Sequence, residues 1–312
     1  MDNSISRNTA HKNKALLLLK KMKKYGALYF LISLPILYLI LFNYVPMYGV
    51  QIAFRDFTPA RSILGSPWVG LKHIWRFINN TKFETIMINT LRLSLYGLLT
   101  FPLPILFAFL LNYITSARFK KTVQFISYMP HFISVVVVVG MLNQLFDING
   151  PVNMLFGENP IRFLADKRFF SGLYIWSGVW QGIGFSAIIY IAALAGVSQE
   201  LHEAAIMDGA SILKRFWHID LPSITPTICV LLILQCGSIL NVGYEKIFLM
   251  QNDLNLSVSE VIATYVYRQS LGARIPQYSY AAAVGLFVSL INVVTLAIAN
   301  QAVKRFNGYS LW

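Results

Sequence analysis

The chain has 312 residues, of which 56% are hydrophobic, 14% aromatic and only 12% charged, and its formal net charge is +13. An ordinary soluble domain carries about 25% charged residues, so this composition argues against a water-soluble protein and indicates that lipid is the solvent. The basic residues are spread over several segments without a nucleic-acid-binding motif around them, so the positive charge does not indicate nucleic acid binding.

Six segments without Asp, Glu, Lys or Arg are each longer than the roughly 20 residues that cross a bilayer as a helix. They are residues 25–54, 93–117, 122–146, 169–199, 221–244 and 275–303. We therefore predict an all-α membrane protein with six transmembrane helices. The first segment follows a basic leader, as a signal peptide would, but its apolar run exceeds the roughly 7–15 residues of a cleaved h-region and no small-residue cleavage site follows it, so we expect it to remain as an anchor.

The distribution of Lys and Arg predicts the orientation of these helices. Residues 1–24, 118–121, 200–220 and 304–312 together hold 14 Lys and Arg in 58 positions, and the other three loops hold 12 in 90. The denser set marks the cytoplasmic side, so both termini are expected there. Residues 1–24 would form a basic cytoplasmic segment that meets anionic lipid near Lys20–Lys24, and residues 25–312 one transmembrane domain.

Two external loops each predict a short surface helix. In the first loop, Ile74, Phe77 and Ile78 share one helical face. In the last, Ser257 followed by Glu260 fits a capping box at the start of a helix.

Residues 198–222 form a polar hinge between the fourth and fifth predicted spans. Six charges at the bilayer centre would cost roughly 18 kcal/mol, at about 3 kcal/mol each, so we expect the hinge to lie outside the membrane. Ser198 can cap a helix on which four residues share one face. These are Leu201, Ala204, Ala205 and Asp208.

The second half of the hinge predicts a turn and another short helix. Gly209 can end the first helix because glycine adopts positive φ without steric cost. Ser211 can cap the second helix, with Lys214 and Arg215 available to solvent, and Pro222 can start the fifth span.

The hinge also carries a specific motif, which reads E-A-A, three residues, G, nine residues, I-x-L-P. The matching positions are Glu203, Ala204, Ala205, Gly209, Ile219, Leu221 and Pro222. This pattern resembles the EAA loop of the permease subunits of bacterial ATP-binding-cassette (ABC) importers. The resemblance implies a permease bundle in which the first hinge helix, the coupling helix, docks into a cytoplasmic ATPase. Glu203 would help to hold it there, and the hinge would transmit ATP-driven closure to the spans.

Further segments between Asn43 and Trp312 indicate which group of these permeases the chain resembles. They are "NYVPMYGVQIAFRDF", "GSPWVGLKHI", "NVGYEKIFLM", "ATYVYR", "YSYAAAVGLFVSLIN" and "GYSLW". They are similar to carbohydrate-importer permeases of the lipoprotein-associated polysaccharide or aldouronate type. This implies a bacterial cytoplasmic membrane protein whose partners are an ABC ATPase dimer, a second permease and an extracellular or periplasmic sugar-binding protein, expected to be a lipoprotein. A sibling is favoured over a second copy of this chain, although the sequence leaves both open.

No G-x-x-x-x-G-K-[ST] loop occurs, so ATP and Mg²⁺ are expected on the separate ATPase and no cofactor on this chain. The five histidines show no metal-ligand spacing and no acid–base constellation is suggested, so we expect neither a metal site nor catalytic residues. The histidines are His11, His73, His131, His202 and His218. Cys229 and Cys236 lie about 10 Å apart along one predicted helix, too far for a disulfide.

The fourth and fifth spans contain candidate sugar-binding groups, because aromatic faces pack against sugars and amide groups bind hydroxyls in a protected cavity. The candidates are Trp176, Trp180, Gln181, Gln235 and Asn241. Gly182 and Gly184 beside them permit close helix contact or a local irregularity. Alternatively, Trp176 belongs to an interfacial aromatic belt, and Gln235 and Asn241 hydrogen-bond neighbouring helices.

The family resemblance places Tyr244, Glu245 and Lys246 near an external gate, although the two charged residues could also form an exposed loop pair.

The wider resemblance therefore implies the permease subunit of a carbohydrate importer that works by alternating access. An ATP-independent channel or carrier is the alternative, because the lack of charge in the six segments counts against ion coupling but not against a passive pore. An importer of another solute is also compatible with the EAA loop alone. A membrane-embedded enzyme would need a catalytic constellation that the sequence does not suggest.

Overall fold

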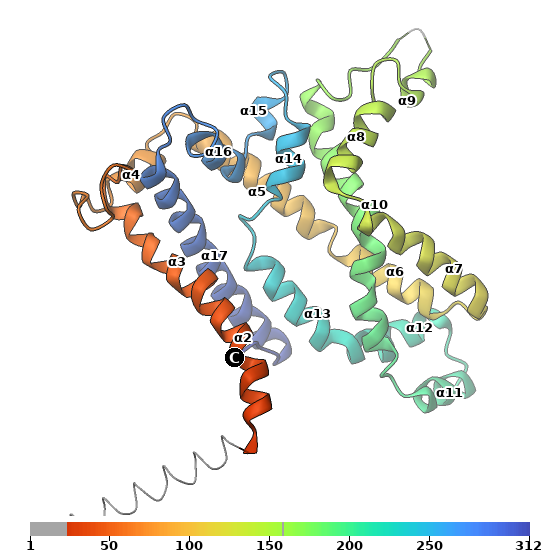
Figure 1. The fold of residues 1–312 in the computed structure, drawn as a ribbon. Coiled ribbons are helices and arrows are strands. Elements are labelled where there is room, and N and C mark those ends of the chain that lie inside the picture. The colour runs from red at the N-terminus through yellow and green to blue at the C-terminus, as the bar shows by residue number, and fades with distance from the viewer. Residues whose placement is uncertain (1–23, 158) are drawn as a thin grey trace, which may run out of the picture. The chain divides into compact units, whose positions relative to one another are not determined.

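The computed structural model describes residues 24–157 and 159–312, which are mostly helical (Figure 1). Within these residues the one β-type pairing is an isolated bridge between Arg55 and Trp68, which confirms the all-α fold class. The chain divides into two compact units, Met1–Gly70 and Leu71–Trp312, which are described separately. Except for Lys24, the basic segment predicted over residues 1–24, with its expected lipid contact, lies outside the described residues.

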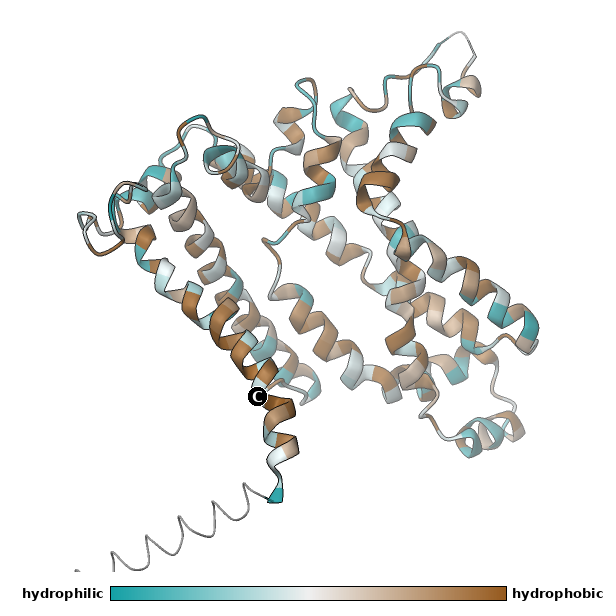
Figure 2. Ribbon diagram, viewed as in Figure 1, coloured by the Kyte–Doolittle hydropathy of each residue, from teal (hydrophilic) through white to brown (hydrophobic). Residues whose placement is uncertain are grey.

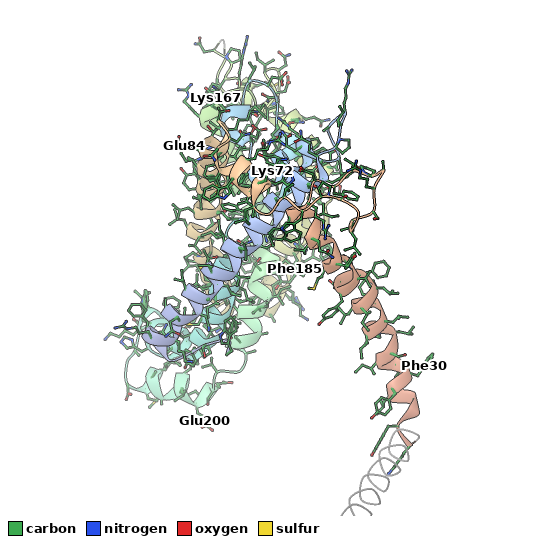
Figure 3. All side chains as sticks on the ribbon, turned by 90° about the vertical axis from the view of Figure 1, so that its left-hand side faces the viewer. Phe30, Lys72, Glu84, Lys167, Phe185 and Glu200 are labelled. Carbon is green, nitrogen blue, oxygen red and sulfur yellow. The ribbon has the colours of Figure 1, made fainter. Side chains whose placement is uncertain are left out.

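The first unit contains a continuous apolar helical stretch, Gly26–Phe54, with a mean hydropathy of 2.0. Its segments are α2 (Gly26–Leu39), a π-helical turn (Ile40–Tyr44), α3 (Val45–Met47) and a 3₁₀ segment (Tyr48–Phe54). Large apolar side chains such as Phe30 project outward (Figure 3), as a helix surrounded by lipid requires. This stretch agrees with the first predicted span.

Four further stretches are long and apolar enough to cross a membrane, and all belong to the second unit. They are Phe83–Asn112, Lys167–Leu194, Ile212–Cys236 and Tyr278–Asn307, with mean hydropathies from 1.4 to 2.3. Their elements are α5 (Phe83–Leu99), α6 (Pro102–Asn112), α10 (Lys167–Leu194), α12 (Ile212–Arg215), a π-helical turn (Phe216–Asp220), α13 (Leu221–Cys236) and α17 (Tyr278–Asn307). Figure 2 shows hydrophobic residues along these helices.

The third predicted span is not one straight helix. The segment Ala117–Phe132, formed by α7 (Ala117–Tyr128) and a 3₁₀ turn (Met129–Phe132), meets α8 (Val135–Leu145) at 99°. The extended backbone of Ile133 and the N-cap of Ser134, whose Oγ accepts a hydrogen bond from Val137 N, separate the two halves. Gln181 Nε2 donates to Ile133 O at 2.9 Å, so the break has a partner for its free carbonyl. The described chain therefore has five candidate spans, and six if this bent pair counts as one.

Two predicted span boundaries also differ from the structure. The second span begins at Phe83 rather than at residue 93, and it includes Arg92, whose Nη2 donates to Val258 O at 2.8 Å. The polar contact places this charge against protein rather than lipid. The helix of the fifth span begins at Ile212 and ends at Cys236, so residues up to 244 are not part of it.

Short helices complete the second unit. They are α4 (Lys72–Ile78), α9 (Pro151–Met154), α11 (Gln199–Met207), α14 (Tyr244–Met250), α15 (Leu256–Ser259) and α16 (Ile262–Gln269). The first confirms the predicted helix in that loop, with Phe77 buried. The predicted capping box is wrong, because Ser257 lies within α15 and Glu260 follows its end. Glu260 instead pairs with Lys82 at 3.1 Å and Arg268 at 3.4 Å.

Helices α6, α10 and α13 pack around a shared core. Ile105 and Phe109 of α6, Ala187 of α10 and Ile224 of α13 are buried together. A Cβ at Gly184 would collide with the carbonyl of Ser127, so glycine allows α10 to approach α7 closely, as predicted. Gly182 has open space beside it instead.

The second unit has two distinct ends in Figure 3. Lys72, Glu84 and Lys167 lie at one end, and Glu200 of α11 lies at the other. The hinge therefore lies far along the helices from the loops that precede α5 and α10.

Candidate coupling loop and transport cavity

The hinge folds as a helix, a turn and a second helix. Helix α11 ends at Met207, and Gly209 has a φ of +72°, which confirms its predicted role as the residue that ends this helix. Ser211 accepts a hydrogen bond from Lys214 N at 3.4 Å, as predicted. Pro222 lies in the first turn of α13, but the helix of the fifth span already begins at Ile212, so the prediction that Pro222 starts this span is wrong. Ser198 occupies the N-cap position, but its side chain makes no capping hydrogen bond, so that part of the prediction is wrong.

Helix α11 exposes an apolar surface. Leu201 is 54% exposed, Ile206 52% and Met207 86%, and Ala204 beside them is also exposed. Glu203 accepts a hydrogen bond from Gln199 Nε2 at 3.1 Å, which fixes its carboxylate on the helix surface. Apolar side chains gathered on a polar, protruding helix are typical of a protein interaction site.

The hinge is tied to the spans through one buried carboxylate, Asp220. This residue is fully buried. Tyr113 OH, just after the end of α6, donates to Oδ2 at 2.5 Å, and His202 Nε2 of α11 lies 3.1 Å from Oδ1. We call His202, Asp220 and Tyr113 the hinge junction. Through direct side-chain contacts, the hinge junction connects α11, the start of α13 and the end of α6.

Other contacts enclose the junction. The Arg215 guanidinium lies 5.5 Å from the centre of the Tyr113 ring. The prediction that Arg215 is directed to solvent is therefore wrong. Phe216 packs edge-on against Phe109 with ring centres 4.1 Å apart. Burial and the hydrogen bond to Asp220 both raise the pKa of the Tyr113 hydroxyl, so this group stays a donor.

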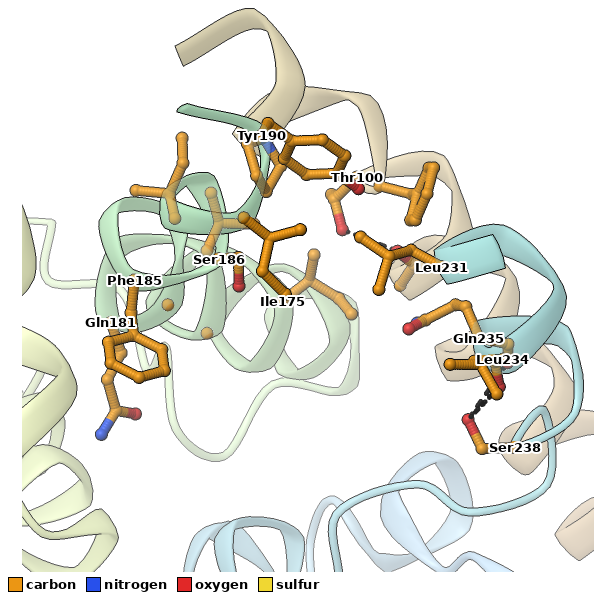
Figure 4. A pocket seen from close by; sticks show the side chains of 18 of the residues that line it. Thr100, Ile175, Gln181, Phe185, Ser186, Tyr190, Leu231, Leu234, Gln235 and Ser238 are labelled. Atoms are coloured by element: carbon orange, nitrogen blue, oxygen red, sulfur yellow. Dashed lines mark hydrogen bonds between the residues drawn. The ribbon is translucent and has the colours of Figure 1, made fainter. Parts of the chain in front are cut away.

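A cavity of about 930 Å³ lies between α5, α6, α10, α13 and α14 (Figure 4). It runs from Tyr174 to Tyr190 on α10, sixteen residues or about 24 Å along the helix axis. Most of its lining is apolar, and its polar groups include Thr100, Ser186 and Ser238. An elongated apolar cavity with a few hydroxyl and amide groups suits an extended polar ligand that also has apolar faces.

These features match a known family. Residues 24–308 match the family described as the binding-protein-dependent transport system inner membrane component. The chain belongs to this family. It is therefore a multi-pass membrane protein, the permease subunit of an ABC importer, and it is not itself an enzyme.

Named relatives and solved structures agree with this assignment. The permease is 43% identical over 300 residues, 95% of this chain and 92% of the relative, to the polygalacturonan/rhamnogalacturonan transport system permease protein YteP of Bacillus subtilis. It is 41% identical to protein LplB of the same organism, over 93% of this chain and 92% of the relative. A crystal structure of a bacterial ABC transporter involved in the import of the acidic polysaccharide alginate matches with a TM-score of 0.84 and 36% identity, over 93% of this chain and 99% of that chain.

A second structure of an alginate ABC transporter, in complex with an alginate pentasaccharide-bound periplasmic protein, has a TM-score of 0.85 and 34% identity. It covers 94% of the permease and 99% of that chain.

The structure divides the predicted sugar-binding residues of the permease into groups. Gln181 and Gln235 line the large cavity, and Asn241 lines an adjoining hollow of about 260 Å³ that shares Gln235 with it. Trp176 and Trp180 line a different hollow of about 510 Å³, whose lining is almost entirely apolar. The cavity that contains the amides is therefore the stronger candidate for a polar ligand.

The predicted gate residues also separate. Tyr244 stacks on Phe248 with ring centres 5.5 Å apart, and Glu245 is exposed. Lys246 is only 9% exposed and lines the cavity, so the alternative of an exposed loop pair is wrong for this residue. Its environment could not be read from the sequence, because its partner Tyr174 lies 72 residues earlier.

Within the described part of the permease, no group of three or more His, Cys, Asp or Glu side chains could hold a metal ion. His131 stacks on Phe185 at 3.8 Å between ring centres, and His202 belongs to the hinge junction. Cys229 and Cys236 are both free thiols.

Proposed function

We propose that this permease moves a carbohydrate, an oligosaccharide rather than a single sugar, from a substrate-binding protein across the cytoplasmic membrane by alternating access. The observation that carries the proposal is the hinge junction, because it connects an exposed docking helix directly to helices that line an elongated cavity. The names of the relatives support the substrate class, since they include transport systems for polygalacturonan and for arabinooligosaccharides. Neither the family nor the structure favours the alternative of an ATP-independent channel.

The driving force would come from a separate ABC ATPase dimer that holds ATP and Mg²⁺. Helix α11 would dock into a cleft of this ATPase, with Leu201 and Met207 providing apolar contact and Glu203 a charged one. The residues of the motif around them would position the helix. They are Ala204, Ala205, Asp208, Gly209, Ile219, Leu221 and Pro222. Removing the exposed apolar surface of α11 from water would favour the complex.

Closure of the ATPase would move α11, and the hinge junction would pass this movement to α6 and α13. Asp220 accepts a hydrogen bond from Tyr113 and lies 3.1 Å from His202, so a displacement of α11 would also displace the start of α13. Leu231 and Gln235 line the cavity further along this same helix. The junction would thereby change the shape of the cavity when the ATPase closes.

A second permease would close the open side of the cavity. A sibling subunit is the expected partner, with a second copy of this chain as the alternative. The similar alginate transporter, which was solved in complex with a periplasmic protein, supports a binding protein as the partner at the other end. That protein would deliver the sugar near α14, and a lipoprotein is the form implied by the sequence resemblance.

Both termini are proposed to lie in the cytoplasm together with the hinge. The basic segment of residues 1–24 supports this orientation, because Lys and Arg concentrate on the cytoplasmic side. In Figure 1 the last turns of α17 lie toward the same end of the second unit as α11, which is consistent with a cytoplasmic C-terminus.

The proposal is tested by purifying the tagged permease from its native membrane in a mild detergent and identifying the co-purifying proteins by mass spectrometry. We expect an ABC ATPase, a sibling permease and a sugar-binding lipoprotein. A Leu201→Asp, Met207→Asp variant should lose the ATPase and keep the sibling. Recovery of the chain without any ATPase, unchanged by these substitutions, would contradict the proposal.

A further inference from the structure

Lys246 is a buried cation that has no acidic partner. Its residue is only 9% exposed, and the described part of the chain forms no ion pair with it. Its Nζ donates one hydrogen bond, to Tyr174 O at 3.1 Å, and lies 5.3 Å from the centre of the Tyr174 ring. An ammonium group has three donors, so two remain for another partner.

Holding this cation without a counter-ion is costly for the fold. Burial lowers its pKa from 10.5 to about 8, and no carboxylate opposes that effect. An apolar side chain of similar length would fill the position without this penalty. A buried cation without a counter-ion that lines a cavity is a candidate for binding a ligand.

The ammonium group has access to the cavity because two glycines lie beside it on α10. Nζ would be 3.5 Å from a Cβ at Gly178, and a Cβ at Gly182, one turn further, would meet nothing within 4 Å. Both glycines and Lys246 line the cavity. Because these two glycines have no side chains, the space between Nζ and the cavity stays open. A larger residue at either position would fill this space.

The remaining lining of the cavity is neutral. It contains amide and hydroxyl groups, including Gln181, Gln235 and Ser238, but no Asp or Glu. Lys246 is its only charged residue, so the described lining has a positive potential that an apolar, weakly screened site strengthens. Such a lining attracts an anion and would repel a cationic sugar.

We infer that the substrate is an acidic oligosaccharide and that Lys246 binds a carboxylate of one of its sugar units during passage. This inference rests on the proposed function, because it names the substrate class of the same transport cavity. The amide and hydroxyl groups would bind sugar hydroxyls, while Phe101 and Phe185 offer apolar faces to the rings. A carboxylate near Nζ would also oppose the effect of burial and raise the pKa of the lysine again.

The test uses the complete importer, reconstituted in proteoliposomes with its binding protein. ATP-dependent uptake is measured for tetragalacturonate, tetraguluronate and the methyl ester of each, together with neutral maltotetraose. The variants are Lys246→Gln, Lys246→Arg and Lys167→Gln. The last is a matched control, because Lys167 is an exposed lysine at the start of α10 and does not line the cavity.

We expect wild-type importer to take up at least one acid faster than its ester. Lys246→Gln should reduce acid uptake by about tenfold to a hundredfold, the range of a hydrogen bond between charged groups, and change ester uptake less than twofold. Lys246→Arg should recover much of the loss, and Lys167→Gln should resemble wild type. Equal losses for acid and ester would mean that Lys246 only holds α14 against α10, and would overturn the inference.

Uptake of esters or maltotetraose without uptake of any acid would also overturn the inference, while leaving the proposed carbohydrate importer intact. ATP hydrolysis without uptake of any of the five saccharides would instead count against the proposed function itself.

Discussion

Replacing Tyr113 by Phe removes a single oxygen atom from the hinge junction. The hydroxyl donates to Asp220 Oδ2, and Asp220 is fully buried, so water cannot replace the lost donor in the present conformation. A hydrogen bond to a charged group contributes about 1.5–3 kcal/mol, and we expect the free energy of unfolding to fall by that amount. The aromatic ring stays in place, so the contact with the Arg215 guanidinium is retained.

The functional effect of Tyr113→Phe should exceed its effect on ATP hydrolysis. If the junction passes the movement of α11 to α6 and α13, a weakened junction lets the ATPase cycle without moving the spans fully. The assay measures sugar molecules transported per ATP hydrolysed in proteoliposomes, and we expect this ratio to fall several-fold. Tyr128→Phe is the control, because it removes a half-buried tyrosine hydroxyl outside the junction.

His202→Ala should lower the same ratio, since it removes the only contact of α11 with Asp220 among the hydrogen bonds and ion pairs of the described residues. An unchanged ratio in both variants, with folded protein confirmed by thermal unfolding, would refute the idea that the junction transmits the movement.

Two further variants test the packing and the buried charge. Gly184→Ala should lower the midpoint of thermal unfolding in detergent, because its Cβ collides with the backbone of Ser127. Gly182→Ala is the control and should have little effect. Equal midpoints for the two variants would contradict the close approach of α10 and α7. The pKa of Lys246 is lowered to about 8, whereas the unfolded chain holds that proton up to about 10.4. The unfolded state therefore binds more protons between these values, and stability rises with pH across this interval. The free energy of unfolding of Lys246→Met should thus exceed that of wild type below pH 8, by up to about 3 kcal/mol, and the difference should shrink toward pH 10.4. A difference that does not depend on pH would contradict this account.

Local signals in the sequence predicted the hinge well. Gly209, Ser211 and Pro222 act through their own backbone geometry, so their effects depend little on the rest of the fold. The apolar spans were also predictable, because lipid imposes a composition that a single segment displays. The break in the third span was missed, since its residues are as apolar as a continuous helix. Pro130 and Ser134 are the signals that could have located it.

The hinge junction and Lys246 could not be predicted from local patterns. Asp220 is 107 residues from Tyr113, and its burial depends on how α6 and α13 pack. The cost of charges in lipid predicted only that the hinge lies outside the membrane, and it did not indicate which hinge charge is buried by protein. Likewise, Trp176 and Gln181 are close on α10, yet they face different hollows.

The most direct test of the central claim is ATP-driven uptake by a variant with Glu203 changed to Lys. Glu203 is exposed on α11 and makes only a surface hydrogen bond with Gln199, so the change should leave expression and membrane insertion intact. Glu84→Lys, which reverses an exposed charge at the opposite end of the second unit, is the control. We predict that Glu203→Lys abolishes uptake of the transported oligosaccharide and that Glu84→Lys does not. Uptake at the normal rate by Glu203→Lys would contradict the assignment of α11 as the helix through which a separate ATPase drives transport.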